Sequence, residues 1–479
     1  MATLSSAGIG SGLDVASIVQ QLMAIERRPL QALQTSDKKT QDQLSAYGRL
    51  QSAMTTLQDA ARRLTDATTW RATTVASAST SAVTATSSGN TPAGSYAVNV
   101  TRLASAQTVS SQGLTGPDEA LGPGSLTIEM GTWGAGQTTF APDAARSPVT
   151  LRFNPPNDTL QSVAAAINAA DAGVNASIVT DASGTRLAIR STVTGETNGF
   201  RITVNDDDGD NGDVAGLSRL AFDPSNGIAR LTQGLAAANA TATVNGIPVS
   251  SATNDFTNVM DGMSFKMQAT TTTPVEVTVN RDTAAMKKNI TDFATAYNDL
   301  MKLMREQTRT PEGGAAGGVL QGDASAVGVV RQLRSLAGSS TGAATAFSRL
   351  TDIGLEPQRD GTLKVNDSKI DAALGNLPEL QNFFARNEDG TASDGFGQLF
   401  RAFANDRLDT DGTLTARQRA LRDRIEANGD RRDVLEQRLA LVEKRLTEQY
   451  SRLDTTVARF SSLQNYVNQQ ITNWNKSTR

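Results

Sequence analysis

Apolar residues at heptad spacing occupy both ends of this 479-residue chain. A helix with apolar residues alternately three and four positions apart carries one apolar face, and that face needs a partner to bury it. The terminal seams consist of Val15, Ile18, Leu22 and Ile25 at one end and of Leu446, Tyr450, Leu453, Val457, Phe460, Val467, Ile471 and Trp474 at the other. Because a long stretch rich in threonine, serine, glycine and valine lies between the helical parts without this period, we predict that the two ends pair and carry that stretch as an insertion.

Two further seams lie nearer the middle of the chain. They are Tyr47, Leu50, Met54, Leu57 and Leu64, and then Met286, Ile290, Phe293, Tyr297, Leu300 and Met304. A helix stripe is more often intramolecular core than an intermolecular seam, so we assign both to a bundle within one subunit. The outermost seams, in contrast, belong to helix pairs that are marginal alone. We expect those ends to become ordered when neighbouring subunits cover them.

The residues between the helical parts indicate strands. Tyr96, Val98 and Val100 alternate at period two, which is typical of a half-buried strand. Similar patterns occur at 126–128, 149–153, 176–179, 186–189, 200–204, 241–249 and 264–279, with a short helix predicted at 160–170. Pro274 interrupts the last of these runs, so it is either an edge strand or two shorter strands.

These patterns predict an α+β multidomain fold. Its N- and C-terminal helices pair in a coiled-coil or helical-bundle leg, and β-rich head domains are inserted between them. We predict four domains: a terminal leg (1–40 with 445–479), a helical bundle (41–70 with 284–444), a β-rich head domain (71–103 with 237–283) and an inserted β-rich head domain (104–236).

The composition argues against several classes of function. The chain has neither cysteine nor histidine, so it has no disulfide, no thiolate metal site and no Ser-His-Asp or Cys-His mechanism. We therefore predict no enzyme, no cofactor and no metal. The formal net charge of −4 argues against nucleic acid as a partner. No run of 18 apolar residues is present, and the first basic residue, Arg27, follows the first apolar stretch, so we expect neither a membrane span nor a cleaved signal peptide.

One acidic stretch, residues 205–213, invites a calcium interpretation. If Asp206 is the first position of an EF-hand loop, the sixth position is Asn211 rather than glycine, and the twelfth is Leu217 rather than a carboxylate. An exposed turn is therefore the favoured interpretation, and calcium binding stays an alternative.

Several distinct short motifs occur in the N-terminal and C-terminal parts of the chain. Residues 8–14 read Gly-Ile-Gly-Ser-Gly-Leu-Asp, 290–293 read Ile-Thr-Asp-Phe, 296–298 read Ala-Tyr-Asn, 320–323 read Leu-Gln-Gly-Asp, and 353–355 (Ile-Gly-Leu) precede 361–363 (Gly-Thr-Leu). Together they resemble the flagellar hook-associated protein 2 family, the filament cap proteins. The resemblance covers both termini and most of 285–479, whereas 104–236 is more similar to a flagellin-type insert through 158–160 (Asp-Thr-Leu), 167–168 (Ile-Asn) and 186–187 (Arg-Leu).

The resemblance implies a protein secreted through the flagellar type III apparatus that forms a homo-oligomeric ring at the distal filament tip. There the helical ends would act as legs, and exported flagellin would fold and be incorporated beneath a plate of β domains. The implied partners are flagellin, the hook–filament junction proteins and a cytoplasmic export chaperone that binds the C-terminal helix. We expect the two terminal seams to form these oligomer, filament and chaperone interfaces.

Three other interpretations remain. A hook–filament junction subunit or a minor flagellin would share paired terminal helices around β inserts. An adhesin would present the acidic insert 104–236 to a host or matrix. An enzyme is the third, and it would need an activity that survives deletion of both termini.

Overall fold

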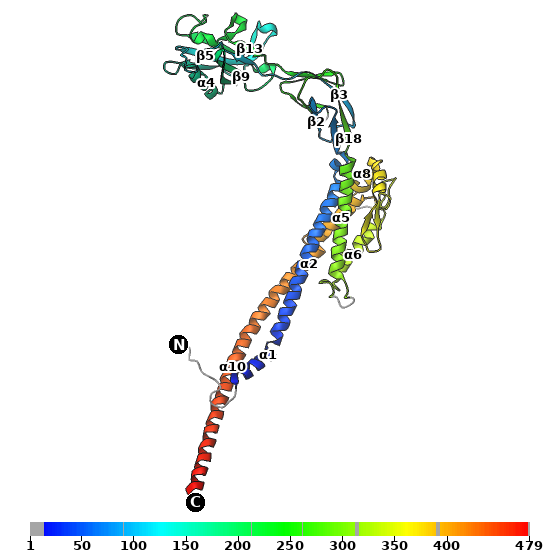
Figure 1. Ribbon diagram of the computed structural model, residues 1–479. Helices are drawn as coiled ribbons and strands as arrows, with labels where there is room; N and C mark the ends of the chain where they lie inside the picture. The colour runs from blue at the N-terminus through cyan, green and yellow to red at the C-terminus, as the bar shows by residue number, and fades with distance from the viewer. Residues whose placement is uncertain are drawn as a thin grey trace. The chain divides into compact units, whose positions relative to one another are not determined.

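The computed structural model describes residues 14–89, 91–211, 213–260, 262–311, 316–388 and 393–477. The chain divides into two compact units, unit 1 with Met1–Trp70 and Ala284–Arg479, and unit 2 with Arg71–Thr283. Unit 1 is helical and unit 2 is built mainly of strands (Figure 1). The α+β fold with paired terminal helices and inserted β structure is thus confirmed. Apart from Asp14, the predicted motif at 8–14 lies outside the described residues.

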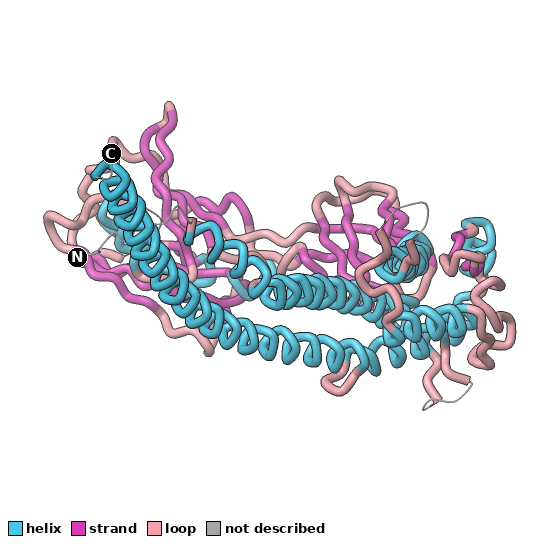
Figure 2. Tube along the Cα trace, turned by 90° about the horizontal axis from the view of Figure 1, so that it is seen from below, coloured by secondary structure: helices cyan, strands magenta, loops and turns pink. Residues whose placement is uncertain are grey.

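Unit 1 consists of helices and one small hairpin. Within the described residues these elements are α1 (Val15–Glu26), α2 (Arg28–Thr65), α3 (Ala67–Arg71), α5 (Thr283–Thr308), α6 (Ala324–Ala337), β19 (Leu355–Pro357), β20 (Leu363–Val365), α7 (Asp367–Leu374), α8 (Leu377–Ala385), α9 (Phe396–Leu408) and α10 (Thr413–Ser477). The two longest, α2 and α10, run side by side (Figures 1 and 2), and Gln418 on α10 donates a hydrogen bond to Gln51 on α2 at 2.8 Å.

Local sequence signals set where the N-terminal helices begin. Asp14 caps α1, since its carboxylate accepts a hydrogen bond from the backbone N–H of Ser17 at 3.0 Å. Pro29 lies in the first turn of α2, where its missing N–H has no intrahelical partner to lose. The proline therefore fits the first turn of α2, which begins at Arg28, and the break between α1 and α2 falls at Arg27.

The two inner seams form the core of unit 1. Every predicted residue of both seams is buried. Aromatic rings join α5 to α9, because Phe400 lies edge-on to Phe293 and Tyr297 with ring centroids 5.0 and 5.9 Å apart. The prediction that these seams are intramolecular core is confirmed for the chain as described.

Unit 2 contains two β-rich bodies, each with its own hydrophobic core. One combines a sheet of order β1-β18-β3-β14-β15 with a sheet of order β16-β17-β2. Its strands are β1 (Thr73–Ser77), β2 (Val83–Ser87), β3 (Gly94–Arg102), β14 (Ala240–Val244), β15 (Ile247–Ser251), β16 (Asp255–Met260), β17 (Met263–Met267) and β18 (Val275–Arg281). The chain enters and leaves unit 2 through β1 and β18, which pair antiparallel with Thr73 opposite Arg281.

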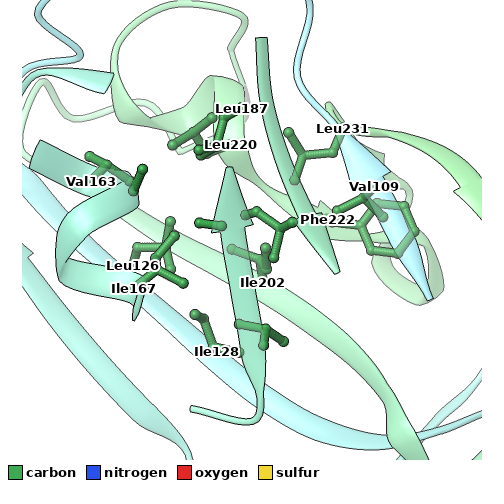
Figure 3. Close-up of a cluster of buried hydrophobic side chains, with 14 of the residues drawn as sticks. Val109, Leu126, Ile128, Val163, Ile167, Leu187, Ile202, Leu220, Phe222 and Leu231 are labelled. Carbon is green, nitrogen blue, oxygen red and sulfur yellow. The ribbon is translucent and has the colours of Figure 1, made fainter. Parts of the chain in front are cut away.

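The second body lies within the predicted insert. Sheets of order β12-β11-β10-β5-β6, with β7 beside β5, and β13-β4-β9-β8 share its core with α4 (Figure 3). Its elements are β4 (Thr108–Ser110), β5 (Gly124–Trp133), β6 (Phe140–Pro142), β7 (Val149–Phe153), α4 (Leu160–Ala169), β8 (Val174–Asp181), β9 (Gly184–Ser191), β10 (Gly199–Asp206), β11 (Phe222–Asp223), β12 (Ile228–Ala229) and β13 (Thr232–Leu235). The division of the whole chain into four domains stays a prediction.

The structure corrects one strand prediction and decides between the two alternatives of another. Residues 241–249 are a hairpin rather than one strand, because Asn245 and Gly246 both adopt positive φ, 50° and 80°, and reverse the chain between β14 and β15. The run around Pro274 is two strands, since β17 ends at Met267 and β18 begins at Val275.

Candidate assembly interface on the terminal helices

The helix α1 packs on the middle of α10. Its side chains Val15, Val19 and Met23 are buried against a half-buried row on α10. This row consists of Leu439, Val442, Leu446 and Tyr450. Arg27 forms an ion pair with Glu443 at 3.1 Å, but both side chains are about half exposed. Burial of the apolar side chains therefore contributes most of the stability of the contact between α1 and α10.

The face that α1 buries is displaced from the predicted seam. Of the predicted seam residues, Val15 is buried within the chain, and Ile18 and Leu22 are half-buried. Val19 and Met23 occupy the buried positions, and Ile25 is 56% exposed. Of the predicted seam on α1, Ile25 is therefore the residue most open to a partner, and Ile18 and Leu22 are open in part.

The apolar face of α10 continues past the end of α1 into exposed helix. We call its six exposed members the distal stripe. They are Leu453 (47% exposed), Phe460 (65%), Leu463 (57%), Val467 (46%), Ile471 (50%) and Trp474 (74%). The predicted Val457 lies on the same face and is half-buried. Since 453, 460 and 467 are seven residues apart, these side chains share one side of the helix.

Leu463 was missed when the terminal seam was predicted. Its signal is present in the spacing, because it follows Phe460 by three positions and precedes Val467 by four. Tyr466, 58% exposed, lies beside it. A second signal is composition: residues 460–474 contain no charged side chain, although α10 is rich in arginine and glutamate before them. A partner that covers this segment would desolvate no ionic group, so its burial carries no charge penalty.

A second apolar feature lies between α2 and α10. A shallow groove there is lined by Pro29, Ala32, Leu33, Ser36, Asp430, Arg431, Val434 and Leu435. The sequence patterns did not predict it, because a groove depends on the separation of two helices rather than on the spacing within either one.

An ion pair between an exposed arginine and a buried aspartate holds the N-terminal part of α10. Arg417 contacts the carboxylate of Asp323 at 3.1 Å, and the Asp323 side chain is 5% exposed. The same carboxylate caps α6 by accepting hydrogen bonds from the N–H groups of Ser325 and Ala326. Burial, with a further contribution from Asp323, raises the pKa of Tyr47 well above its usual range. These contacts fix the start of α10 in unit 1.

The acidic stretch of unit 2 forms a turn closed by its own hydrogen bonds. The Asp206 carboxylate accepts from the backbone N–H of Ser218 at 3.0 Å, and the Asn211 side chain accepts from the N–H of Asp206 at 2.6 Å. Among the described residues no three acidic side chains are grouped as metal ligands. In the same residues, no helix is both long and apolar enough to cross a bilayer.

Three family models match the chain. Residues 11–107 match the flagellar hook-associated protein 2 N-terminus, and 237–462 match the C-terminus of the same family. Residues 156–193, which contain α4, match the flagellin hook IN motif. Here the Asn168 side chain makes paired hydrogen bonds of 2.7 and 2.8 Å with the backbone of Ala176, which ties α4 to β8.

Curated relatives and solved structures agree with these models. The chain is 31% identical over 467 residues to the B-type flagellar hook-associated protein 2 of Pseudomonas aeruginosa, covering 94% of this chain and 93% of the relative. It is 29% identical to the flagellar hook-associated protein 2 of Escherichia coli K12, over 99% of each chain. The crystal structure of the D1-D2-D3 domains of the flagellar cap protein FliD from Escherichia coli matches with a TM-score of 0.59 and 28% identity, over 79% of this chain and 99% of that one.

Proposed function

This chain belongs to the flagellar hook-associated protein 2 family, the cap proteins of the flagellar filament, and on that premise we propose how it acts. It assembles as a homo-oligomeric ring at the distal filament tip and promotes the folding and incorporation of exported flagellin, which prevents loss of flagellin to the medium. The family is structural, so the role requires no catalytic site and no cofactor.

The distal stripe is the observation that supports this proposal most directly. Its six large side chains are about half or more exposed on one face of α10. Contiguous apolar surface of this kind marks a site of protein interaction. Burying one such side chain fully is worth roughly 1.5–3 kcal/mol, so several together hold a leg in place yet still allow it to detach and bind again.

The same helix is the proposed site for partners met at different stages. In the cytoplasm an export chaperone takes the stripe into a groove, as amphipathic helices are commonly recognised. After export through the flagellar type III apparatus, the terminal helices contact neighbouring copies, the hook–filament junction proteins at first, and then flagellin. Ile25, exposed on α1, belongs to the same proposed interface.

Because this chain belongs to the cap protein family, a role at the filament tip is favoured over the role of a junction subunit or of a minor flagellin. A hook–filament junction subunit or a minor flagellin would also be found in the flagellum, but at its base or along its shaft. Gold-labelled antibody to residues 104–236, viewed on intact cells by electron microscopy, separates the three. We expect one label at each distal filament tip; label at the base or along the shaft would contradict the proposal.

A substitution in the distal stripe tests the interface. Leu453→Asp places a carboxylate in the stripe, so we expect cells to release flagellin into the medium and the chaperone to bind at least ten-fold more weakly. The β bodies of unit 2 should remain folded. Leu441→Asp is the matched control, because Leu441 is 70% exposed on the same helix and lies outside the stripe. Normal filaments and normal chaperone affinity for Leu453→Asp would remove the stripe from the interface.

A further inference from the structure

A polar layer interrupts the packing of α2 against α10. Above it, towards the bundle, Gln51 bonds Gln418, and below it Leu33 and Leu435 line the groove. Among the described residues, the one buried side chain of α2 between Leu33 and Ala46 is Thr40, at 1% exposure, and the one buried side chain of α10 between Leu421 and Leu435 is Asn428, at 5% exposure. Asp37 lies at the same level on α2. We call Asp37, Thr40 and Asn428 the polar layer.

Two atoms of the polar layer are buried without a hydrogen-bond partner among the described residues. They are Nδ2 of Asn428, a donor, and Oδ1 of Asp37, an acceptor. The other Asp37 oxygen accepts a long hydrogen bond of 3.3 Å from Gln41. A buried polar atom without a partner is costly, so this level holds the two helices together less well than the apolar levels on either side.

Both helices are also weakened at this level. Gly429 follows Asn428 inside α10, and a Cβ added there would meet nothing within 4 Å, so packing does not require a glycine. Glycine in a helix interior lowers helix stability through its backbone freedom. On α2 the hydroxyl of Thr40 donates to the carbonyl of Ser36 at 2.9 Å, a back-bond that tends to bend helices.

We propose that the polar layer is a two-state hinge in the leg. One state is the arrangement described here, with the Asn428 donor and the Asp37 acceptor apart. In the other state α10 bends at Gly429 and Asn428 donates to Asp37, which satisfies both atoms. The two states are discrete because they differ by one complete hydrogen bond rather than by gradual bending.

The hinge separates two parts of unit 1 that have different tasks. The bundle side holds Tyr47 and the Arg417–Asp323 pair, and the other side holds α1, the groove and the distal stripe. A bend at Gly429 re-aims the stripe without opening either apolar core. The hinge is a property of unit 1 that is separate from the proposed cap function, and it can be measured on the purified full-length chain.

Distance measurements between spin labels test the hinge. The chain has no cysteine, so cysteines placed at the exposed Thr55 and Glu448 label one site on each side of the polar layer. Pulsed electron double resonance should show two distance populations in the starting protein. Asn428→Asp places a carboxylate opposite that of Asp37, so the hydrogen bond of the bent state cannot form. This variant should show only one distance population.

Gly429→Ala is the second variant, and Gly48→Ala is its matched control. Both glycines lie inside helices, and a Cβ would meet nothing within 4 Å at either one, but Gly48 lies on the bundle side of the polar layer. We expect Gly429→Ala to slow hydrogen exchange of the amides around Asn428 about five-fold, from the helix propensity of alanine over glycine. Gly48→Ala should leave those amides and the distance populations unchanged.

Two outcomes would overturn the hinge. A single narrow distance in the starting protein, unchanged in Asn428→Asp, would mean that the leg has one state. Equal slowing of the amides around Asn428 by Gly48→Ala and Gly429→Ala would mean that general helix stability, and not the polar layer, governs the opening.

Discussion

The first turns of α10 and its last turns carry apolar side chains at the same spacing but in different surroundings. Leu414 and Leu421 are buried in unit 1, at 1% and 2% exposure, whereas Phe460 and Trp474 are 65% and 74% exposed. Both segments belong to one uninterrupted helix. The spacing of apolar residues therefore predicts which face of a helix needs a partner, and the rest of the chain decides whether that partner is internal.

Composition separates the two segments more clearly than periodicity does. The first half of α10 has charged residues on its solvent-facing sides, as a helix on the surface of a folded unit requires. Residues 460–474 have asparagine, glutamine, serine and threonine instead. A segment without charge is suited to being surrounded by protein, which supports the proposal that it enters the filament tip.

The largest expected effect contrasts a buried ring with an exposed one. Phe400→Ala removes a ring that packs on Phe293 and Tyr297, so it should lower the free energy of unfolding of unit 1 by about 3–5 kcal/mol. Phe460→Ala should change it by less than about 0.5 kcal/mol, as exposed sites usually do. Urea denaturation followed by helical circular dichroism measures both. Equal losses would mean that the distal stripe is part of the stability of the isolated chain.

An intermediate effect is expected where α1 covers α10. Met23→Ala empties a site that is 2% exposed, and should weaken the docking of α1 by about 2 kcal/mol. Hydrogen exchange should show faster exchange in α1 and around Leu446, with the bundle unchanged. Ile25→Ala is the control, since Ile25 is exposed on the same short helix. If both variants behave alike, the displaced face of α1 has been assigned incorrectly.

The smallest effect at neutral pH concerns two tyrosines. Burial raises the pKa of Tyr297 to about 12, whereas an unfolded tyrosine has a pKa near 10. The folded state therefore keeps a proton that the unfolded state releases, and this stabilisation is complete below pH 10 and is lost as pH rises towards 12. Tyr297→Phe should make the alkaline unfolding curve of unit 1 shallower. Tyr466→Phe removes a hydroxyl from the exposed part of α10 and is the matched control.

The core of unit 1 could be predicted from the sequence because long helices repeat their pattern. Tyr47 to Leu64 spans five turns, so a single apolar face is the only one that fits all five seam residues. In α1 the sequence does not determine which face is buried. Ile18 and Val19 are neighbours, as are Leu22 and Met23, so two adjacent faces are equally apolar, and the row on α10 selects Val19 and Met23.

Other features depend on distances between elements that are remote in sequence. The hairpin at 241–249 had a local signal, the Asn245-Gly246 pair, which is a strong turn sequence and was not used. The groove and the polar layer had no local sequence signal. Both depend on the register of α2 against α10, which only the assembled helices define. The interface residues on the terminal helices were predicted as apolar faces, and their contacts with partners stay predictions.

The pairing of β1 with β18 has a consequence for how the chain forms during synthesis. Everything between these strands emerges from the ribosome as one continuous stretch, so unit 2 is complete before most of α5 has been made. Unit 1 is the reverse: α2 is made early, but the α9 and α10 surfaces that bury its face come from the last quarter of the chain. The nascent protein therefore holds an uncovered apolar helix at one end until translation is almost finished, which gives any factor that binds unfolded chains a long interval in which to act.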